Sequence, residues 1–379
     1  MALSSNDEVQ FACQEIIEKC VNCGRCVSEC KLLQDIGEDL ISLATRQPTV
    51  GEAYSCTLCG LCEGVCPLSL SPRKMFVATR HKAVDEQEID IDDYKYMFPD
   101  RELNVMKMYR EVNKFDYKDL KVDQEGEVAF FPGCTLLTYD PKLIYAIVEN
   151  LEAEYPGVTL ITDCCGIPLY QLGLRERGEK FRQALKEKLR RLKVKSLILA
   201  CSNCYYQLKE DVKELGIRPL TIYEALSDSR IFNTPIEAKE ARVVTVHDSC
   251  PDRFAGIFAR QARQALAKKG YVLVEMEHNS AKALCCGSGG QASHFAPELA
   301  RGLVEARLEE VTGLEVDILA SYCLGCVLNL SKDQNDIPVQ HVLNLLLDLK
   351  QDFAGLKKQS KTIFEGPEGE KLWERIMAD

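Results

Sequence analysis

Ten of the nineteen cysteines in this chain form two groups of five with nearly the same spacing. In each group a single cysteine is followed by an adjacent pair that precedes a glycine, and then by two cysteines separated by two residues. The first quintet is Cys134, Cys164, Cys165, Cys201 and Cys204, and the second quintet is Cys250, Cys285, Cys286, Cys323 and Cys326. Corresponding cysteines lie 116 to 122 residues apart, which indicates a unit that has been used twice.

Five thiols in one unit favour a centre that is larger or more open than the common metal sites. A tetrahedral zinc site or an ordinary cubane cluster takes four protein ligands. Adjacent cysteines such as Cys164 and Cys165 point in different directions, so they bind one compact ion only with strain and bridge or bind separate irons more easily. Two zinc ribbons are the alternative, and they would leave one thiol of each unit unused.

Two further cysteine blocks near the N-terminus have the spacing of a two-cluster ferredoxin. In such a block, three thiolates surround one cluster and the fourth serves the other cluster. Lys31 stands where a proline would complete the first block, whereas Pro67 completes the second. The spacing predicts Cys20, Cys23, Cys26 and Cys66 as ligands of cluster 1, and Cys56, Cys59, Cys62 and Cys30 as ligands of cluster 2. Cys13 lies outside every pattern, and we expect a buried core thiol.

Short apolar runs precede the cysteines of both quintets, as parallel strands would. The runs are 128–131, 158–161 and 196–200 in the first copy, and 243–246, 271–276 and 316–320 in the second. Helical periodicity at 142–151 and 174–192 separates the first three runs. Alternating strands and helices predict a parallel sheet with right-handed crossovers. The cysteines would then gather at the carboxyl ends of the strands, where open α/β sheets place their ligands.

We therefore expect a mixed fold, with a small, mostly helical ferredoxin domain followed by two tandem α/β repeats with parallel sheets. The expected parts are the ferredoxin domain at 1–84, an acidic linker and helix at 85–126, the repeats at 127–236 and 237–350, and a charged tail at 351–379. Six of the nine residues in 85–93 are acidic, which is typical of a solvated connector. Apolar residues between 97 and 112 could form one amphipathic helix. We expect the tail, which carries Trp373, to fray rather than to dock.

Charge and hydropathy exclude several classes of protein. A net charge of −11 over 379 residues argues against nucleic acid as a partner. No apolar run of about 18 residues occurs, and the N-terminus is polar, so we expect a cytoplasmic protein without a membrane span. Cytosolic thiols are kept reduced, so the cysteines indicate metal rather than disulfides.

Four sequence motifs around the quintets resemble a known family. They are Phe131-Pro132-Gly133-Cys134, Cys164-Cys165-Gly166-Ile167-Pro168-Leu169, His247-Asp248-Ser249-Cys250 and Cys285-Cys286-Gly287-Ser288-Gly289-Gly290. From Cys20 to Leu347 the chain resembles the D subunit of heterodisulfide reductase, in which a ferredoxin-like C subunit is fused to the B subunit with its two cysteine-rich CCG domains. The resemblance implies one noncubane [4Fe-4S] cluster on each quintet, cluster 3 on the first and cluster 4 on the second, and a disulfide that is cleaved between them.

The chain departs from the family pattern beside the second quintet. Pro251 stands where many relatives have a histidine, and Leu324 where a proline is common. The proton-donor role of that histidine cannot be transferred. His247 and His294 are the nearby imidazoles, and His247 is a possible catalytic residue, although a structural role is the usual one for a histidine at a strand end.

Three functions are open at the level of sequence. The first is an enzyme that passes single electrons through two cubane clusters to two noncubane clusters, which reduce a disulfide or oxidise thiols. The second is an iron-sulfur relay subunit of a larger flavoprotein complex, of the glycolate or lactate oxidase or class II benzoyl-CoA reductase type. The third is a structural zinc protein. No Gly-rich nucleotide motif occurs, so we expect flavin on a partner subunit of a hetero-oligomeric complex and none on this chain.

Overall fold

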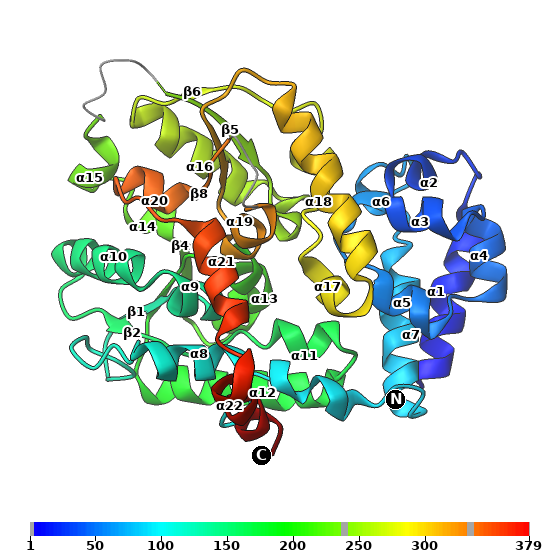
Figure 1. The fold of residues 1–379 in the computed structure, drawn as a ribbon, viewed down its shortest axis with the longest axis horizontal. Helices are drawn as coiled ribbons and strands as arrows, with labels where there is room; N and C mark the ends of the chain where they lie inside the picture. The colour runs from blue at the N-terminus through cyan, green and yellow to red at the C-terminus, as the bar shows by residue number, and fades with distance from the viewer. Residues whose placement is uncertain (1–3, 236–241, 332–336, 379) are drawn as a thin grey trace.

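Short helices form the N-terminal domain in the computed structural model, which describes residues 4–235, 242–331 and 337–378. The two longest, α1 and α7, pack side by side, and the shorter ones lie against them (Figure 1). Gly24 and Gly60 adopt a left-handed φ immediately before the helices that carry Cys26 and Cys62. The helices are α1 Ser5–Lys19, α2 Arg25–Glu29, α3 Lys31–Ile36, α4 Leu40–Arg46, α5 Val50–Ser55, α6 Leu61–Gly64 and α7 Arg73–Asp85.

The connecting segment contains two short helices instead of the single amphipathic helix that we expected. These are the 3-10 helix η1 Ile91–Met97 and the α-helix α8 Val105–Asn113. Pro99 interrupts the segment, because proline cannot donate a hydrogen bond within a helix. The Asn104 side chain then accepts from the Lys107 amide and begins α8. Met108 and Tyr109 are buried where α8 packs against α9.

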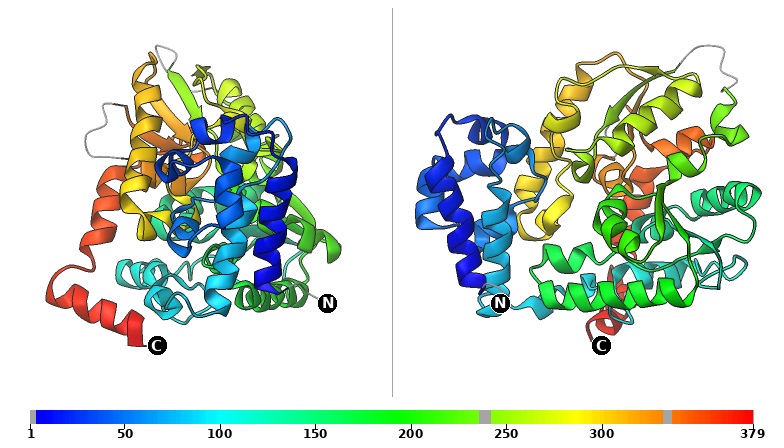
Figure 2. Two further views of the ribbon diagram at one scale, coloured as in Figure 1. Left: turned by 90° about the vertical axis from the view of Figure 1, so that its right-hand side faces the viewer. Right: turned by 180° about the vertical axis from the view of Figure 1, so that it is seen from behind.

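Two four-stranded parallel sheets follow, beside the N-terminal helices (Figure 2). Both sheets have the same strand order. The first is ordered β2-β1-β3-β4 and the second β6-β5-β7-β8. Their strands are β1 Val128–Phe131, β2 Thr159–Leu160, β3 Ser196–Leu199, β4 Arg218–Thr221, β5 Val243–His247, β6 Val272–Leu273, β7 Ile318–Ser321 and β8 Val339–His341. The equal order confirms the duplication and the mixed fold class.

Helices cover both sheets and complete the two repeats. In the first repeat they are α9 Cys134–Tyr139, α10 Pro141–Glu154, α11 Ile167–Gln171, α12 Arg175–Arg191, α13 Ser202–Glu214, α14 Ile222–Ala225 and α15 Arg230–Asn233. In the second they are η2 Cys250–Asp252, α16 Ile257–Lys268, η3 Ser280–Lys282, η4 Gly289–Gln291, α17 Ala292–Phe295, α18 Pro297–Thr312, α19 Leu324–Leu330 and α20 Val342–Leu346. The boundary that we expected at 236/237 lies outside the described residues.

The two repeats share one apolar core. Phe258 of α16 lies at its centre and contacts aromatic rings from both repeats. The centroids of its ring and the Tyr205 ring are 5.5 Å apart, and those of its ring and the Tyr322 ring are 6.0 Å apart. The repeats are therefore packed as one body, which fixes the distance between their cysteine-bearing edges.

Buried Arg80 of α7 joins the N-terminal domain to both repeats. Its guanidinium donates to the carbonyl of Cys56 at 2.6 Å, to that of Gly290 at 2.8 Å and to that of Gln171. A Cβ on Gly290 would lie 2.3 Å from the Cys56 oxygen, so glycine is needed for this approach. The N-terminal domain also packs on α17 and α18, as Figure 1 shows.

The C-terminal tail folds as two helices, so the expected frayed end is wrong. The helix α21 Phe353–Thr362 packs on α19, and α22 Gly366–Ala378 packs on α8 and η1. Phe353 and Ile376 are buried, and the centroids of the Trp373 and Tyr96 rings are 5.0 Å apart. In the part of the chain that the structure describes, no helix combines the length and the apolar character needed to cross a membrane.

Candidate functional site

A first small pocket lies between α1, α2 and the segment after α6. The cysteines that line it are Cys20, Cys23, Cys26, Cys62 and Cys66. Cys66 belongs to the second sequence block, so the fold brings it to the cysteines of the first block, as the spacing predicted. Burial, together with the nearby Cys20 and Cys66, raises the pKa of the Cys26 thiol to about 11. Thiolates gathered in this way require a bound cation to offset their charge.

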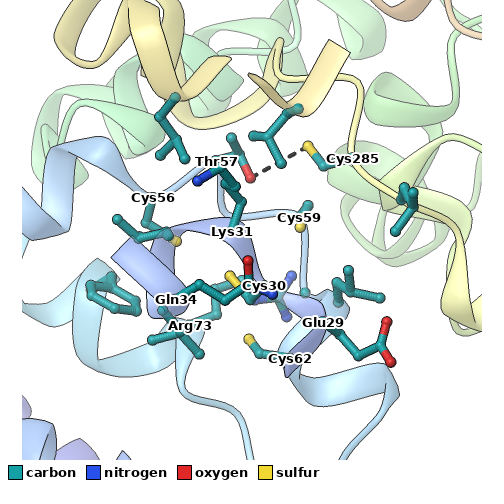
Figure 3. Close-up of a pocket in the computed structure, with 18 of the residues that line it drawn as sticks. Glu29, Cys30, Lys31, Gln34, Cys56, Thr57, Cys59, Cys62, Arg73 and Cys285 are labelled. Atoms are coloured by element: carbon teal, nitrogen blue, oxygen red, sulfur yellow. Dashed lines mark hydrogen bonds between the residues drawn. The ribbon is translucent and has the colours of Figure 1, made fainter. Parts of the chain in front are cut away.

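A second pocket of about 160 Å³ contains the other set of four. Figure 3 shows the side chains of Cys30, Cys56, Cys59 and Cys62 around it. Burial, together with Cys59 and Cys56, raises the pKa of Cys30 to about 12. The structure thus brings together both predicted sets, with Cys62 at the boundary between the pockets. Their role as cluster ligands stays a prediction.

Cys285 of the second quintet also lines this second pocket. Its thiol donates to the Thr57 hydroxyl at 3.4 Å, the dashed contact in Figure 3. A hydrogen bond with Cys286 and burial raise the pKa of Cys285, although a hydrogen bond with Cys59 opposes them. Cys285 therefore lies between the cysteines of the N-terminal domain and those of the second repeat.

The remaining nine cysteines of the two quintets line a single central cavity of about 360 Å³. They follow strands of both sheets at the carboxyl ends. They are Cys134, Cys164, Cys165, Cys201, Cys204, Cys250, Cys286, Cys323 and Cys326. The sulfurs of Cys134 and Cys164 are 3.7 Å apart, and those of Cys286 and Cys326 are 3.1 Å apart. Two sulfur-rich sites thus face one shared space.

Backbone geometry around the first quintet brings Gly133 close to two of its cysteines. A Cβ on Gly133 would lie 3.0 Å from the Cys201 Cβ and 3.1 Å from the Cys204 sulfur. Hydrogen bonds from Cys164 and Cys204 lower the pKa of Cys165, which favours its thiolate form.

The second quintet has a thiolate at a helix start. Cys323 is the N-cap of α19, and its pKa is lowered to about 6 by a hydrogen bond from the Cys326 thiol and by the backbone amides of Cys326 and Gly325. Asn203 of the first repeat points its amide at the Cys323 sulfur at 3.8 Å. Low-pKa thiols suit a soft, cationic iron-sulfur centre.

The donor set fits iron-sulfur clusters better than mononuclear zinc. Among the described residues, His247, Cys286 and Cys326 offer ligand atoms within 4.8 Å of one another. A zinc ion there would use two of the five thiols in the quintet. Five thiols fit a larger centre, and four with ferredoxin spacing fit a cubane.

Comparison with known proteins agrees with this arrangement. Residues 15–70 match the family model "4Fe-4S dicluster domain", and residues 128–209 and 244–331 match "Cysteine-rich domain". The chain carries a dicluster domain and two cysteine-rich domains. The predicted resemblance to the D-subunit family of heterodisulfide reductase is confirmed, since curated D-subunit sequences are 23 to 26% identical over most of the chain.

Three relatives illustrate the range of similar proteins. The D subunit of dihydromethanophenazine:CoB–CoM heterodisulfide reductase from Methanosarcina mazei is 26% identical, covering 81% of this chain and 79% of the relative. The B subunit of fumarate reductase (CoM/CoB) from Methanothermobacter marburgensis is 26% identical, covering 86% and 71%. Lactate utilization protein A from Oceanobacillus iheyensis is 24% identical, covering 52% and 84%.

His247 lies buried at the end of β5 in the second cysteine-rich domain. Arg307 donates from Nε to its Nδ1 at 3.0 Å, so the ring proton is on Nε2. Glu310 forms an ion pair with the Arg307 guanidinium, with 2.7 Å between Oε2 and Nη1. Burial and the Arg307 charge lower the pKa of His247 to about 3. The ring is neutral and can donate one hydrogen bond beside Cys286 and Cys326. Its catalytic role stays a prediction.

The two other imidazoles near the cysteines lie in different places. His294 lines a separate cavity, where its Nδ1 is 2.8 Å from the Tyr96 hydroxyl. His341, which the sequence did not single out, lines the central cavity. It lies fifteen residues beyond Cys326, so only the pairing of β7 with β8 brings it close.

A second cavity of about 890 Å³ adjoins the first quintet, and we call it the entrance cavity. Cys134 and Cys164 line both cavities, and Trp373 of α22 lines the entrance cavity. Lys107 and Arg110 of α8 also line it, and neither forms an ion pair with a described carboxylate. Burial and the Arg110 charge lower the pKa of Lys107. Asp163 and Asp100 partly offset the charge of Lys107, and the two cations beside the first quintet can hold an anionic group.

Proposed function

We propose that this chain is an iron-sulfur oxidoreductase subunit of the heterodisulfide reductase type, which reduces a disulfide or oxidises two thiols in the central cavity. The observation that carries the proposal is that cysteines of both quintets line one cavity. An electron relay needs only one site facing its acceptor. Two sulfur-rich sites across a shared space can hold both sulfurs of a disulfide.

The reaction balances as RS–SR′ + 2 e⁻ + 2 H⁺ → RSH + R′SH. The S–S bond breaks, and each sulfur gains one electron and one proton. When bound, the clusters supply the electrons one at a time. The electrons come from a reduced flavoprotein or another low-potential donor, and the protons come from solvent.

The proposal assigns ligands as the sequence predicted. Two cubane [4Fe-4S] clusters are held by Cys20, Cys23, Cys26 and Cys66 and by Cys56, Cys59, Cys62 and Cys30. Two noncubane [4Fe-4S] clusters are held by the first quintet and by the second quintet.

Contacts within the chain support an order of the four sites. Thr57 and Cys285 join the second N-terminal pocket to the second quintet. Arg80 holds the Cys56 carbonyl against Gly290 beside the same quintet. The second quintet then lies between the dicluster domain and the first quintet, which faces the entrance cavity. Lys107 and Arg110 favour a substrate that carries an anionic group.

Relatives with subunit names indicate a multi-subunit complex, and we propose a flavin-containing subunit as electron donor. A cytoplasmic location stays a prediction.

The alternative is a relay subunit of a flavoprotein complex. Similarity to lactate utilization protein A over 52% of the chain favours it. In a relay the quintets conduct electrons and bind no substrate sulfur.

Stoichiometric reduction under anaerobic conditions distinguishes the two. Protein reduced by a low-potential dye should consume organic disulfides with two electrons per disulfide and no partner present. Cys165→Ala and Cys286→Ala should each abolish this reaction while the dicluster domain can still be reduced. Disulfides that stay intact with wild-type protein carrying all its iron would favour the relay.

A further inference from the structure

His341 occupies a buried position at the wall of the central cavity. It is the last residue of β8, pairs with Ser321 of β7 and is 1% exposed. The same sheet edge carries Cys323, two residues after Ser321. The ring therefore lies at the carboxyl ends of the strands, together with the second quintet.

The hydrogen bonds of the ring fix which nitrogen carries the proton. Nδ1 accepts from the Leu343 amide at 3.2 Å and begins α20, so the proton is on Nε2. Burial lowers the pKa of His341 to about 3, with a small opposing effect of the Tyr322 backbone, and the ring is neutral. The ring interacts weakly with the Tyr322 backbone, but among residues 4–235, 242–331 and 337–378 no group makes a hydrogen bond of full geometry with Nε2. A buried N–H without an acceptor is costly, so an acceptor absent from the polypeptide is expected.

The first cysteine-rich domain shows what this position needs for structure alone. Thr221 ends β4, pairs with Leu199 and begins α14, so it corresponds to His341. It forms a capping box with Glu224 and donates to Gln261 at 2.7 Å, and it does not line the central cavity. Threonine is a preferred N-cap residue, and histidine is not. Capping therefore explains Thr221 but does not explain an imidazole at 341.

We propose that His341 donates a hydrogen bond from Nε2 to an anionic sulfur in the central cavity. This inference rests on the proposed function. It adds His341, which lies outside all the sequence motifs. The sulfur belongs either to a substrate thiolate or to the cluster on the second quintet. Among the described residues, His247 lies within 4.8 Å of Cys286 and Cys326, and His341 belongs to no such group. His247 lies beside the predicted cluster ligands, and His341 lines the cavity that both quintets share.

The test uses full-length anaerobic protein with its iron content verified. His341→Thr restores the capping residue of the first domain and removes the donor, while His341→Gln keeps an N–H. Thr221→Ala is the matched control, because it removes the corresponding cap far from the cavity. Two quantities are measured: the midpoint potentials of the quintet clusters without thiol, and the mercaptoethanol concentration that half-saturates the thiol-dependent change in their paramagnetic signal.

Loss of one hydrogen bond should change an equilibrium constant about tenfold. This change would appear either as a shift of about 59 mV in a one-electron midpoint potential or as a tenfold change in the half-saturating thiol concentration. If the midpoint potential of a quintet cluster is lower in His341→Thr without thiol, the sulfur that accepts the hydrogen bond belongs to the cluster. Weaker thiol binding at an unchanged potential assigns it to the substrate. His341→Gln should recover part of either effect.

Two outcomes separate this inference from the proposed function. If both variants, His341→Thr and Thr221→Ala, are less stable but keep the cluster potentials and the thiol binding of the wild type, His341 serves only as a helix cap. The inference is then overturned. If wild-type protein does not respond to thiols, the proposed function fails, and an unchanged potential in His341→Thr would then overturn the inference as well.

Discussion

The two quintets differ at the residue that ends the strand before their first cysteine. In the first it is Phe131, which is buried and apolar, and in the second it is His247, which carries an N–H beside Cys286 and Cys326. Hydrogen bonds to cluster sulfurs and their ligands raise reduction potentials. The two noncubane clusters are therefore expected to differ in potential.

Replacing His247 by the residue of the other copy tests this difference. His247→Phe should lower one cluster potential by the equivalent of one hydrogen bond, about 59 mV, and leave the other cluster unchanged. Potentiometric titration followed by electron paramagnetic resonance measures both. His294→Gln serves as the control, since His294 lines only the entrance cavity. Equal shifts of both clusters, or none, would contradict the assignment of His247.

Cys286→Ala tests the ligand set of the second quintet. Cys286 lies 3.1 Å from Cys326 in the central cavity, so its loss should remove one cluster. We expect about four of about sixteen irons to be lost, with the dicluster signals intact. Iron and sulfide analysis with low-temperature spectroscopy measures this. Loss of all four clusters would mean that the domains do not assemble independently.

At the scale of elements, a glycine turn shortly after Cys285 and Cys286 holds the two parts of the chain together. Gly290→Ala places a Cβ 2.3 Å from the Cys56 carbonyl at a left-handed φ of +61°. We expect the free energy of unfolding to fall by about 2 kcal/mol more than the strain of the φ angle alone would cause, because the backbone must move at the interface. Electron transfer from the dicluster domain to the second quintet should slow in parallel, measured by rapid mixing.

Gly216→Ala is the matched control for that variant. Gly216 has a similar φ of +73° with nothing within 4 Å, so it should lose only about 1 to 2 kcal/mol of strain energy. Equal losses of stability in the two variants, with unchanged electron transfer, would show that the interface does not depend on Gly290.

The helix α8 supplies a test of substrate charge. Lys107→Met and Arg110→Met should each raise the KM for a carboxylate-bearing disulfide about tenfold and leave that for an uncharged disulfide unchanged. Lys361→Met is the control, because exposed Lys361 lines the rim of the same cavity, where charge counts for less. A uniform rise in KM for both disulfides would point to a change of shape instead.

The strands next to cysteines and the long periodic helices α10 and α12 could be predicted, and several other elements could not. The strands β1, β3, β5 and β7 occur where apolar runs ended at a cysteine, whereas β6 is only two residues long. The strands β4 and β8 were missed because they are short edge strands followed by no motif. The helices α21 and α22 were missed because their few apolar residues pack on distant elements, which a local pattern does not show.

The same limit applies to the candidate site. Cysteine spacing predicted four of the five cysteines that line each N-terminal pocket, because that spacing is set by the loop around a cluster. It could not predict that Cys285 faces the dicluster domain, since direction depends on domain packing. Nor could it show His341 or the two cations of α8, which tertiary contacts bring to the cavities.

At the scale of the whole molecule, the sites form one continuous series. The pockets of the dicluster domain adjoin the second quintet, which shares a cavity with the first quintet, and the entrance cavity lies beyond it. The shared core of the two repeats holds the quintets at a fixed separation. Such an arrangement suits two successive one-electron steps on one substrate.

The most direct test is an oxidative titration of anaerobic protein with a panel of small thiols. The account predicts about sixteen irons per chain and a paramagnetic signal that changes shape with the identity of the thiol. Cys165→Ala and Cys286→Ala should each abolish that dependence. Signals that are identical with and without every thiol, in protein carrying its full iron, would contradict disulfide chemistry between the quintets.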